Sequence, residues 1–213
     1  HGLLRRQRQM CIRDRVGRII DSLKKNGLYD NTIIVFTSEH GEMMGDHGML
    51  EKRTLYEESA RVPMLIKFQN QNEMKKIKGS FSHIDLVPTL LSKINQKLPE
   101  NLQGEDRSYA FEELDFGNNE VVVSWNGTGE IDDRNLGTEK INDLNQNPRR
   151  SIIINRIKLN LTLNDSAELF DLNNDPYEET NLIDSPEYQE IFKSMKEKLI
   201  EWQIKNEDTF RFE

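Results

Sequence analysis

The chain has 213 residues, of which 37 are acidic and 29 basic, giving a net charge of −8 and the size of one ordinary domain, or one domain with a small appendage. Such an acidic balance argues against a broad nucleic-acid-binding surface. No run of about 18 apolar residues occurs, so the sequence predicts no membrane-spanning helix. The single cysteine, Cys11, excludes an internal disulfide and any site built from several thiolates.

Residues 1–15 are strongly basic, with five arginines and one acid, Asp14. The apolar stretch of a signal peptide does not follow them, and a phosphate-binding arm is a second reading. The run RQRQMCIRDR at residues 6–15 resembles translated sequencing-adapter DNA. We therefore interpret residues 1–15 as a non-native leader, expect no biological role for Cys11, and expect the chain to be a piece of a longer protein.

Residues 16–116 alternate between helical and strand patterns. Apolar residues from Val16 to about Gly27 recur at the spacing of one helix face. The β-branched run 32–37 predicts a strand buried on both faces, as in a parallel sheet, and 62–68 predicts a second one. A short helix is expected at 55–60, and Asp85 is expected to cap a helix over 86–93. This order of elements is typical of an α/β fold.

Residues 117–213 follow a different pattern, with four strands predicted at 121–125, 151–155, 157–163 and 168–172. Apolar and polar residues alternate over 157–163, which predicts an antiparallel strand with one face in water. Ser185 and Pro186 begin a helix whose apolar stripe runs from Tyr188 to Trp202. We expect a small antiparallel four-stranded sheet packed by one helix, with residues 126–148 as a long surface loop.

Four side chains with useful chemistry follow the first predicted strand. Glu39 and His40 stand just past its carboxyl end, where ligands bind in open α/β sheets. They could bind a divalent metal or act as acid and base. His47 follows on a glycine-flanked loop, and the ammonium of Lys52 could neutralise an anionic substrate. From these residue types alone, a solvated surface loop remains an equal alternative.

The sequence motifs of this segment resemble those of type I sulfatases, members of the alkaline-phosphatase superfamily. The matching pieces are Thr37-Ser38-Glu39-His40-Gly41, Gly45-Asp46-His47-Gly48, Lys52 with Tyr56-Glu57, and Arg61 with Pro63. The resemblance continues through residues 82–91 and reaches Glu168-Leu169-Phe170-Asp171-Leu172, followed by Asp175-Pro176. It covers about residues 16–205.

This resemblance implies an α/β fold in which residues 16–116 are the carboxy-terminal part of the catalytic domain, with a mostly parallel sheet and flanking helices. Residues 117–213 would be the carboxy-terminal subdomain. Glu39 and His40 match two ligands of a calcium ion, although Glu39 is one methylene longer than the usual Asp. Lys52 matches a lysine that contacts sulfate, and His47 matches a pocket histidine. Arg61 is read as structural, binding a carboxylate such as Glu57.

The implied activity is hydrolysis of a sulfate ester, on a sulfated carbohydrate or an aryl ester. The Cys/Ser-x-Pro/Ala-x-Arg motif that yields the formylglycine nucleophile is missing from this sequence, as is an aspartate pair that completes the metal site. We therefore expect half of an active site and no activity from the chain alone. Alternatives are a phosphodiesterase or phosphonate monoester hydrolase of the same superfamily, and a glycan-binding pseudoenzyme. The resemblance suggests a periplasmic or extracellular location.

Overall fold

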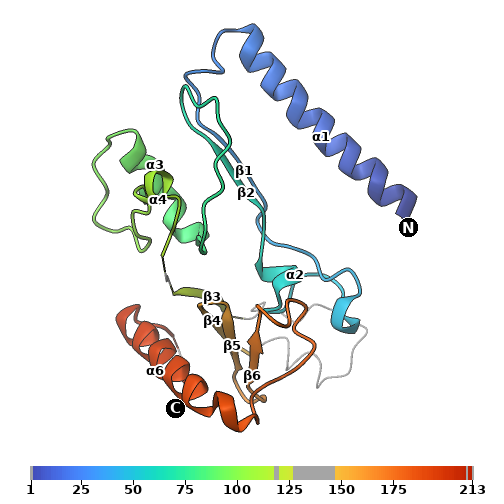
Figure 1. Ribbon diagram of the computed structural model, residues 1–213, viewed down its shortest axis with the longest axis vertical. Coiled ribbons are helices and arrows are strands. Elements are labelled where there is room, and N and C mark those ends of the chain that lie inside the picture. The colour runs from blue at the N-terminus through green and yellow to red at the C-terminus, as the bar shows by residue number, and fades with distance from the viewer. Residues whose placement is uncertain (1, 118–119, 127–146, 210, 213) are drawn as a thin grey trace. The chain divides into compact units, whose positions relative to one another are not determined.

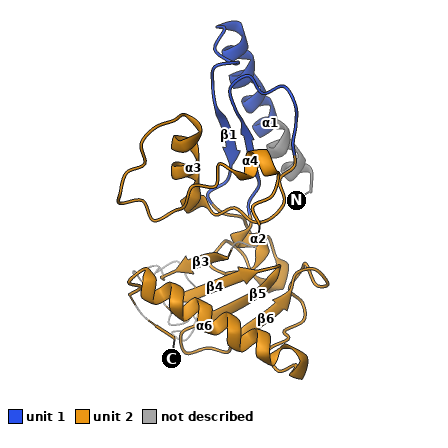
Figure 2. Cartoon of the chain, turned by 60° about the vertical axis from the view of Figure 1, so that its left-hand side comes forward, with its two compact units in different colours: residues 1–39, 62–75 blue, residues 40–61, 76–213 orange. Residues whose placement is uncertain are grey.

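The computed structural model describes residues 2–117, 120–126, 147–209 and 211–212. The chain divides into two compact units (Figure 2). One comprises residues 1–39 and 62–75, and the other residues 40–61 and 76–213. This division groups the segment 40–61 with the carboxy-terminal residues, whereas the domain boundaries expected at residues 15 and 116 stay predictions.

The first unit contains one helix and a two-stranded ribbon. Helix α1 (Gly2–Lys25) includes the helix predicted from Val16 and begins earlier, within the basic leader. Strands β1 (Ile34–Thr37) and β2 (Met64–Lys67) confirm both predicted strands. The Lys67 ammonium of β2 donates to the carbonyl of Tyr29, in the segment between α1 and β1, at 2.6 Å.

The pairing of β1 and β2 corrects the expectation of a buried parallel strand. The two strands run antiparallel, with Ile34 opposite Lys67 and Thr37 opposite Met64. Neither strand is buried on both faces, since Phe36 is 37% and Leu65 63% exposed. The physical reason is that no further strand pairs with this ribbon among the described residues. A two-stranded ribbon cannot bury both of its own faces.

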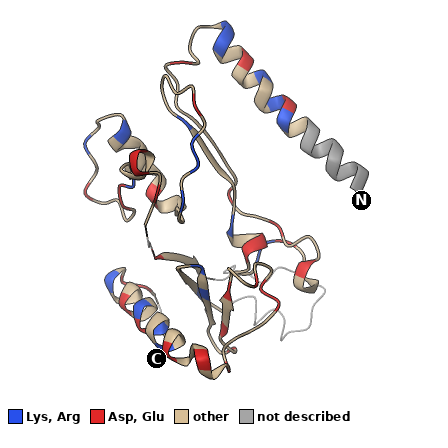
Figure 3. Ribbon diagram, viewed as in Figure 1, with Lys and Arg blue, Asp and Glu red and all other residues tan. Residues whose placement is uncertain are grey.

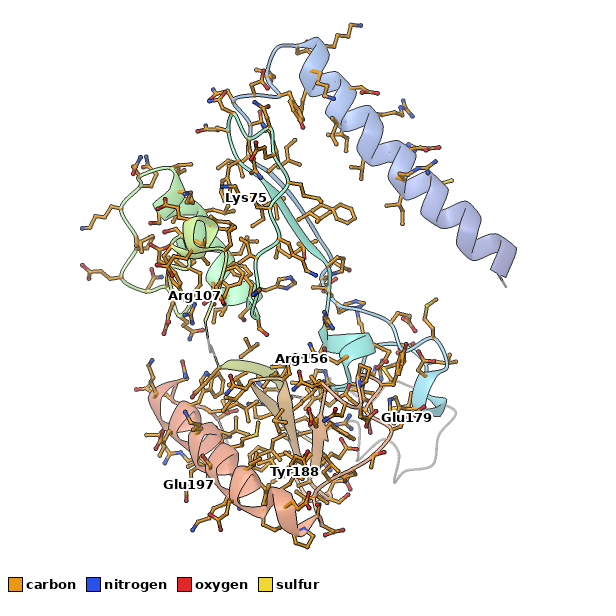
Figure 4. All side chains as sticks on the ribbon, viewed as in Figure 1. Lys75, Arg107, Arg156, Glu179, Tyr188 and Glu197 are labelled. Carbon is orange, nitrogen blue, oxygen red and sulfur yellow. The ribbon has the colours of Figure 1, made fainter. Side chains whose placement is uncertain are left out.

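The second unit begins with short helical elements. They are η1 (Asp46–Gly48), α2 (Glu57–Ala60), η2 (His83–Asp85), α3 (Leu86–Lys93) and α4 (Ala110–Glu113). The predicted helices at 55–60 and 86–93 are therefore confirmed. Asp85 does not cap α3 with its side chain. Its carboxylate instead accepts from the Glu105 amide at 2.9 Å and from Arg107, which Figure 4 labels.

The four-stranded antiparallel sheet is confirmed. It consists of β3 (Val121–Trp125), β4 (Arg149–Ile154), β5 (Ile157–Thr162) and β6 (Glu168–Asp171), in that spatial order. The turn η3 (Pro186–Tyr188) leads into α6 (Gln189–Lys205), which lies along the sheet in Figure 1. Of the predicted surface loop, residues 127–146 lie outside the described part of the chain.

The apolar core lies between this sheet and α6. The fully buried Ile152, Leu159 and Leu169 of the sheet meet Met195 and Leu199 of the helix. Each such side chain contributes about 1.5–3 kcal/mol on leaving water. Tyr188, labelled in Figure 4, joins the edge of this core through a hydrogen bond from its hydroxyl to Asp171. Met195 and Leu199 of the predicted apolar stripe of α6 therefore pack against the sheet.

The other face of the sheet differs from the prediction. Lys158 and Asn160 were expected to face water on β5, yet they are 0% and 3% exposed. Arg150 of β4 is also buried, at 2% exposed, but it stands opposite Leu161 and therefore lies on the sheet face toward α6. The face that carries Lys158 and Asn160 is covered by the segment around α2 and the loop after β6, which contribute carboxylates to the buried Lys158 ammonium. The polar residues of β5 are therefore part of the interior.

The outer surface carries mixed charge. Figure 3 shows Lys and Arg interspersed with Asp and Glu along α6.

Within the described residues, we find no helix that is both long and apolar enough to span a membrane.

Candidate functional site

His40 and Lys52 come together directly. The Lys52 ammonium lies 2.6 Å from His40 Nε2, and His40 Nδ1 lies 2.6 Å from the Gly41 carbonyl oxygen. A carbonyl can only accept, so Nδ1 carries the proton and Nε2 accepts from the ammonium. The imidazole is therefore neutral, and Lys52 keeps its positive charge. His40 is half-buried and Lys52 exposed, so the charge faces solvent at the site.

The helical turn α2 holds both segments that carry this pair. The Gly41 amide donates to the Ser59 carbonyl at 2.7 Å, and the Glu42 amide to the Glu58 carbonyl at 2.8 Å. The Ser59 hydroxyl donates to the Lys52 carbonyl at 2.7 Å. A Cβ atom at position 41 would meet the Glu58 oxygen at 1.9 Å. Only glycine therefore permits this approach.

His47 takes a different place from His40. It lies in the turn η1 with a φ of 52°, in the left-handed region that few residues other than glycine adopt. Its ring stacks on Tyr56, with centroids 4.0 Å apart and planes 1° from parallel. This aromatic contact selects one orientation of an otherwise exposed side chain.

Tyr56 connects this stack to the carboxy-terminal sheet. Its hydroxyl donates to Glu168 Oε1 at 2.6 Å, and its ring meets Phe170 edge-on. Burial, and then the neighbouring Glu168 carboxylate, raise the pKa of Tyr56 above its ordinary value. The phenol therefore stays protonated near neutral pH and acts as a fixed donor.

Glu39 is exposed and directly precedes His40 in the chain. Among the described residues, no group of three or more His, Cys, Asp or Glu side chains could hold a metal ion. Calcium takes 6–8 oxygen ligands in proteins. The described side chains therefore do not fit a complete calcium site, and the ligand roles of Glu39 and His40 stay predictions. The predicted structural role of Arg61 agrees with its 3.7 Å ion pair to Glu57.

A buried charge cluster was missed by the sequence reasoning. The Lys158 ammonium lies 2.9 Å from Glu178 Oε1 and 3.2 Å from Glu57 Oε1. Burial raises the pKa of Glu178, and the Lys158 charge opposes part of that effect. Glu57 precedes Lys158 by 101 residues. The only local signal was the Lys-x-Asn alternation of β5, which also describes an ordinary solvated face.

A family model and several curated relatives indicate the sulfatase family. The family model described as Sulfatase matches residues 13–95. An uncharacterized sulfatase, YidJ of Escherichia coli, is 33% identical over 199 residues, which cover 93% of this chain and 37% of that protein. An arylsulfatase of Clostridium perfringens is 32% identical over 190 residues, covering 87% of this chain and 36% of that protein.

A solved structure supports the same relationship. A protein in complex with its substrate D-glucosamine-2-N,6-O-disulfate is 27% identical and superposes with a TM-score of 0.71, over 92% of this chain and 39% of that one. The chain thus spans less than two-fifths of the length of these relatives. Its α/β elements and four-stranded antiparallel sheet follow the architecture of that structure.

Proposed function

Because the chain belongs to the sulfatase family, we propose that it supplies part of the anion-binding site of a sulfuric ester hydrolase. The substrate would be a sulfated carbohydrate or an aryl sulfate. One observation carries the proposal: the Lys52 ammonium lies 2.6 Å from His40 Nε2, in the loop whose wording matches the family. The exposure of Lys52 supports the proposal, since an anionic group could approach its ammonium from solvent.

The chemistry of the two side chains supports this role. An ammonium has three donors and no acceptor. Lys52 directs one proton to His40 and has two left for oxygens of a sulfuryl group. The neutral imidazole orients the ammonium without competing for the anion. Donors fixed in advance stabilise charge that develops in the transition state, and removing one typically costs about 10²–10³-fold in rate.

The remaining parts of the site would come from outside this chain. We infer that the full-length protein provides the formylglycine nucleophile and the other ligands of one calcium ion, which would offset charge on the sulfate oxygens. Glu39 and His40 alone cannot satisfy such an ion. The chain by itself is then expected to be inactive, and the full-length enzyme to act in the periplasm or outside the cell.

The test uses the full-length protein, recovered by extending the reading frame upstream. We expect hydrolysis of an aryl sulfate, with a preference over the matching aryl phosphate and phosphonate esters. Lys52→Ala should lower kcat/KM for the sulfate at least 100-fold, whereas Lys97→Ala, at another exposed lysine, should leave it unchanged.

Two outcomes would overturn the proposal. A preference for phosphate or phosphonate esters would assign the protein to another hydrolase of the superfamily. Binding of sulfated glycans without any turnover would identify a pseudoenzyme.

A further inference from the structure

The polar face of the carboxy-terminal sheet is built around one fully buried cation. Lys158 of β5 is 0% exposed, and the Glu178 side chain is also 0% exposed. An isolated ammonium at such a position would lose its proton or find a partner. Lys158 has two partners, Glu178 at 2.9 Å and Glu57 at 3.2 Å. One of these carboxylates belongs to α2 and the other follows β6.

Glu178 contacts α2 a second time through the backbone. Its Oε2 accepts from the Glu57 amide at 2.6 Å, which is the amide of the first residue of α2. Lys158 and Glu178 thus hold both the side chain and the main chain of Glu57. Glu178 lies next to Glu179, which Figure 4 labels.

Two further contacts attach the same segment to the sheet. Arg149 of β4 donates to the Arg53 carbonyl at 2.7 Å, and Tyr56 donates to Glu168 of β6 at 2.6 Å. Residues 53–57 are therefore anchored at three points on three different elements. The buried cluster of Lys158, Glu57 and Glu178 is called the anchor below.

The anchor is connected to the candidate anion site through α2, which contains both Glu57 and Ser59. Ser59 of α2 binds the Lys52 carbonyl with its hydroxyl and the Gly41 amide with its carbonyl. Gly41 in turn accepts the proton of His40 Nδ1 on its carbonyl oxygen. A shift of α2 would therefore displace Lys52 and His40 together.

We propose that Lys158, acting with Glu178, is a positioning residue for the reaction: it fixes α2, and through α2 the Lys52–His40 pair. This inference rests on the proposed function of Lys52. It assigns a task to the carboxy-terminal sheet, which contributes none of the predicted site residues. In this proposal the sheet fixes the position of the loop that carries Lys52 and His40, and the buried charges that do so do not contact the substrate.

The main test combines Lys158→Met with Lys52→Ala in the full-length enzyme. Misplacing a catalytic group by about 1 Å can cost on the order of 100-fold in rate. We expect Lys158→Met to lower kcat/KM for an aryl sulfate about 10- to 100-fold. In the Lys52→Ala background, Lys158→Met should lower kcat/KM by less than about a further threefold, because both changes act through the Lys52 ammonium. Lys198→Met, which removes an exposed lysine paired with Glu120, is the matched control and should have no effect.

A second variant separates positioning from folding. Lys158→Met leaves the fully buried Glu178 carboxylate without a cation, whereas Glu57 keeps its ion pair with Arg61. Combining Lys158→Met with Glu178→Gln removes that buried charge and keeps an oxygen for the Glu57 amide. We expect this pair of changes to restore the melting temperature more fully than the rate. Losses that multiply fully with Lys52→Ala, or a rate that recovers in step with stability, would show a merely structural role and overturn the inference.

Hydrogen exchange on the 213-residue chain tests the anchor without any activity. The Gly41 and Glu42 amides are held by carbonyls of α2. In Lys158→Met they should exchange at least tenfold faster, while amides between β4 and β5 keep their rates. Unchanged exchange at Gly41 and Glu42 would refute the anchor. A full-length protein without sulfatase activity would instead refute the proposed function, and the exchange result would still stand.

Discussion

Arg150 and Asp208 form the buried ion pair whose removal gives the sharpest stability prediction. The Arg150 side chain is 2% and the Asp208 side chain 7% exposed. Arg150 Nε lies 2.8 Å from Asp208 Oδ2 and Nη2 lies 2.5 Å from Oδ1, in a two-pronged contact. The remaining donors reach the Trp125 carbonyl at 3.1 Å and Asn126 Oδ1 at 2.7 Å. Asp208 follows α6, so this pair joins the end of the helix to β4.

Asp208→Asn keeps the size of the side chain and removes its charge. Breaking a buried ion pair typically costs about 3–5 kcal/mol, because one charge stays buried without its partner. The asparagine oxygen can still accept one of the two bonds, which places the expected loss near the lower end, at about 3 kcal/mol. A domain has only about 5–15 kcal/mol of stability in total. Urea unfolding followed by circular dichroism should therefore show a large fall in the midpoint.

The control and the pH dependence decide whether the reasoning holds. Glu120→Gln removes the exposed partner of Lys198 and should leave the midpoint unchanged. Burial alone would raise the pKa of Asp208, but hydrogen bonds from Arg150 and Gln203 outweigh it and lower the pKa below its ordinary value. A lowered folded pKa means that the stabilisation exists above the unfolded pKa and is lost as the pH falls through the folded one. Equal urea midpoints for Asp208→Asn and Glu120→Gln would refute the stabilising role of the Arg150–Asp208 pair. The same would follow if the stability of Asp208→Asn and of the wild type fell in parallel as the pH is lowered.

Three other changes probe the core, the site loop and the leader. Leu159→Ala, at a fully buried position, should cost about 2–5 kcal/mol in urea unfolding, whereas Leu50→Ala, at a 75% exposed one, should cost little; equal losses would contradict the assigned core. Gly41→Ala should push the loop away from Glu58, so the nitrogen chemical shifts of His40 should lose the pattern of a ring protonated only at Nδ1; an unchanged pattern would show that the loop adapts. Deleting residues 1–15 should leave the unfolding midpoint unchanged, and a clear fall would contradict the interpretation of a non-native leader.

The carboxy-terminal sheet was predictable because its information is local. Alternation over 157–163 specifies β5, and Asn164-Asp165-Ser166 turns the chain toward β6. The apolar stripe of α6 is buried when it packs on an apolar surface, and the apolar face of the preceding sheet is the nearest such surface along the chain. Each step joins neighbours along the chain, so residue type and period were sufficient.

The ribbon of β1 and β2 shows where local information ends. A run such as Ile33-Ile34-Val35-Phe36 states that a strand prefers apolar surroundings. It does not state the direction of the neighbouring strand, because parallel and antiparallel ladders accept the same side chains. Antiparallel pairing of β1 with β2 therefore could not be read from either strand alone.

The candidate site combines both situations. The contact between Lys52 and His40 spans 12 residues, and the family wording already groups the two side chains. The anchor spans 101 residues between Glu57 and Lys158, and its members look like ordinary charged surface residues in their own segments. A period of two identifies the residues that share a face of β5 but not what covers that face. A charged residue on an alternating strand can therefore be interior whenever a distant carboxylate neutralises it, and only the fold reveals that the loop bearing Lys52 supplies that carboxylate.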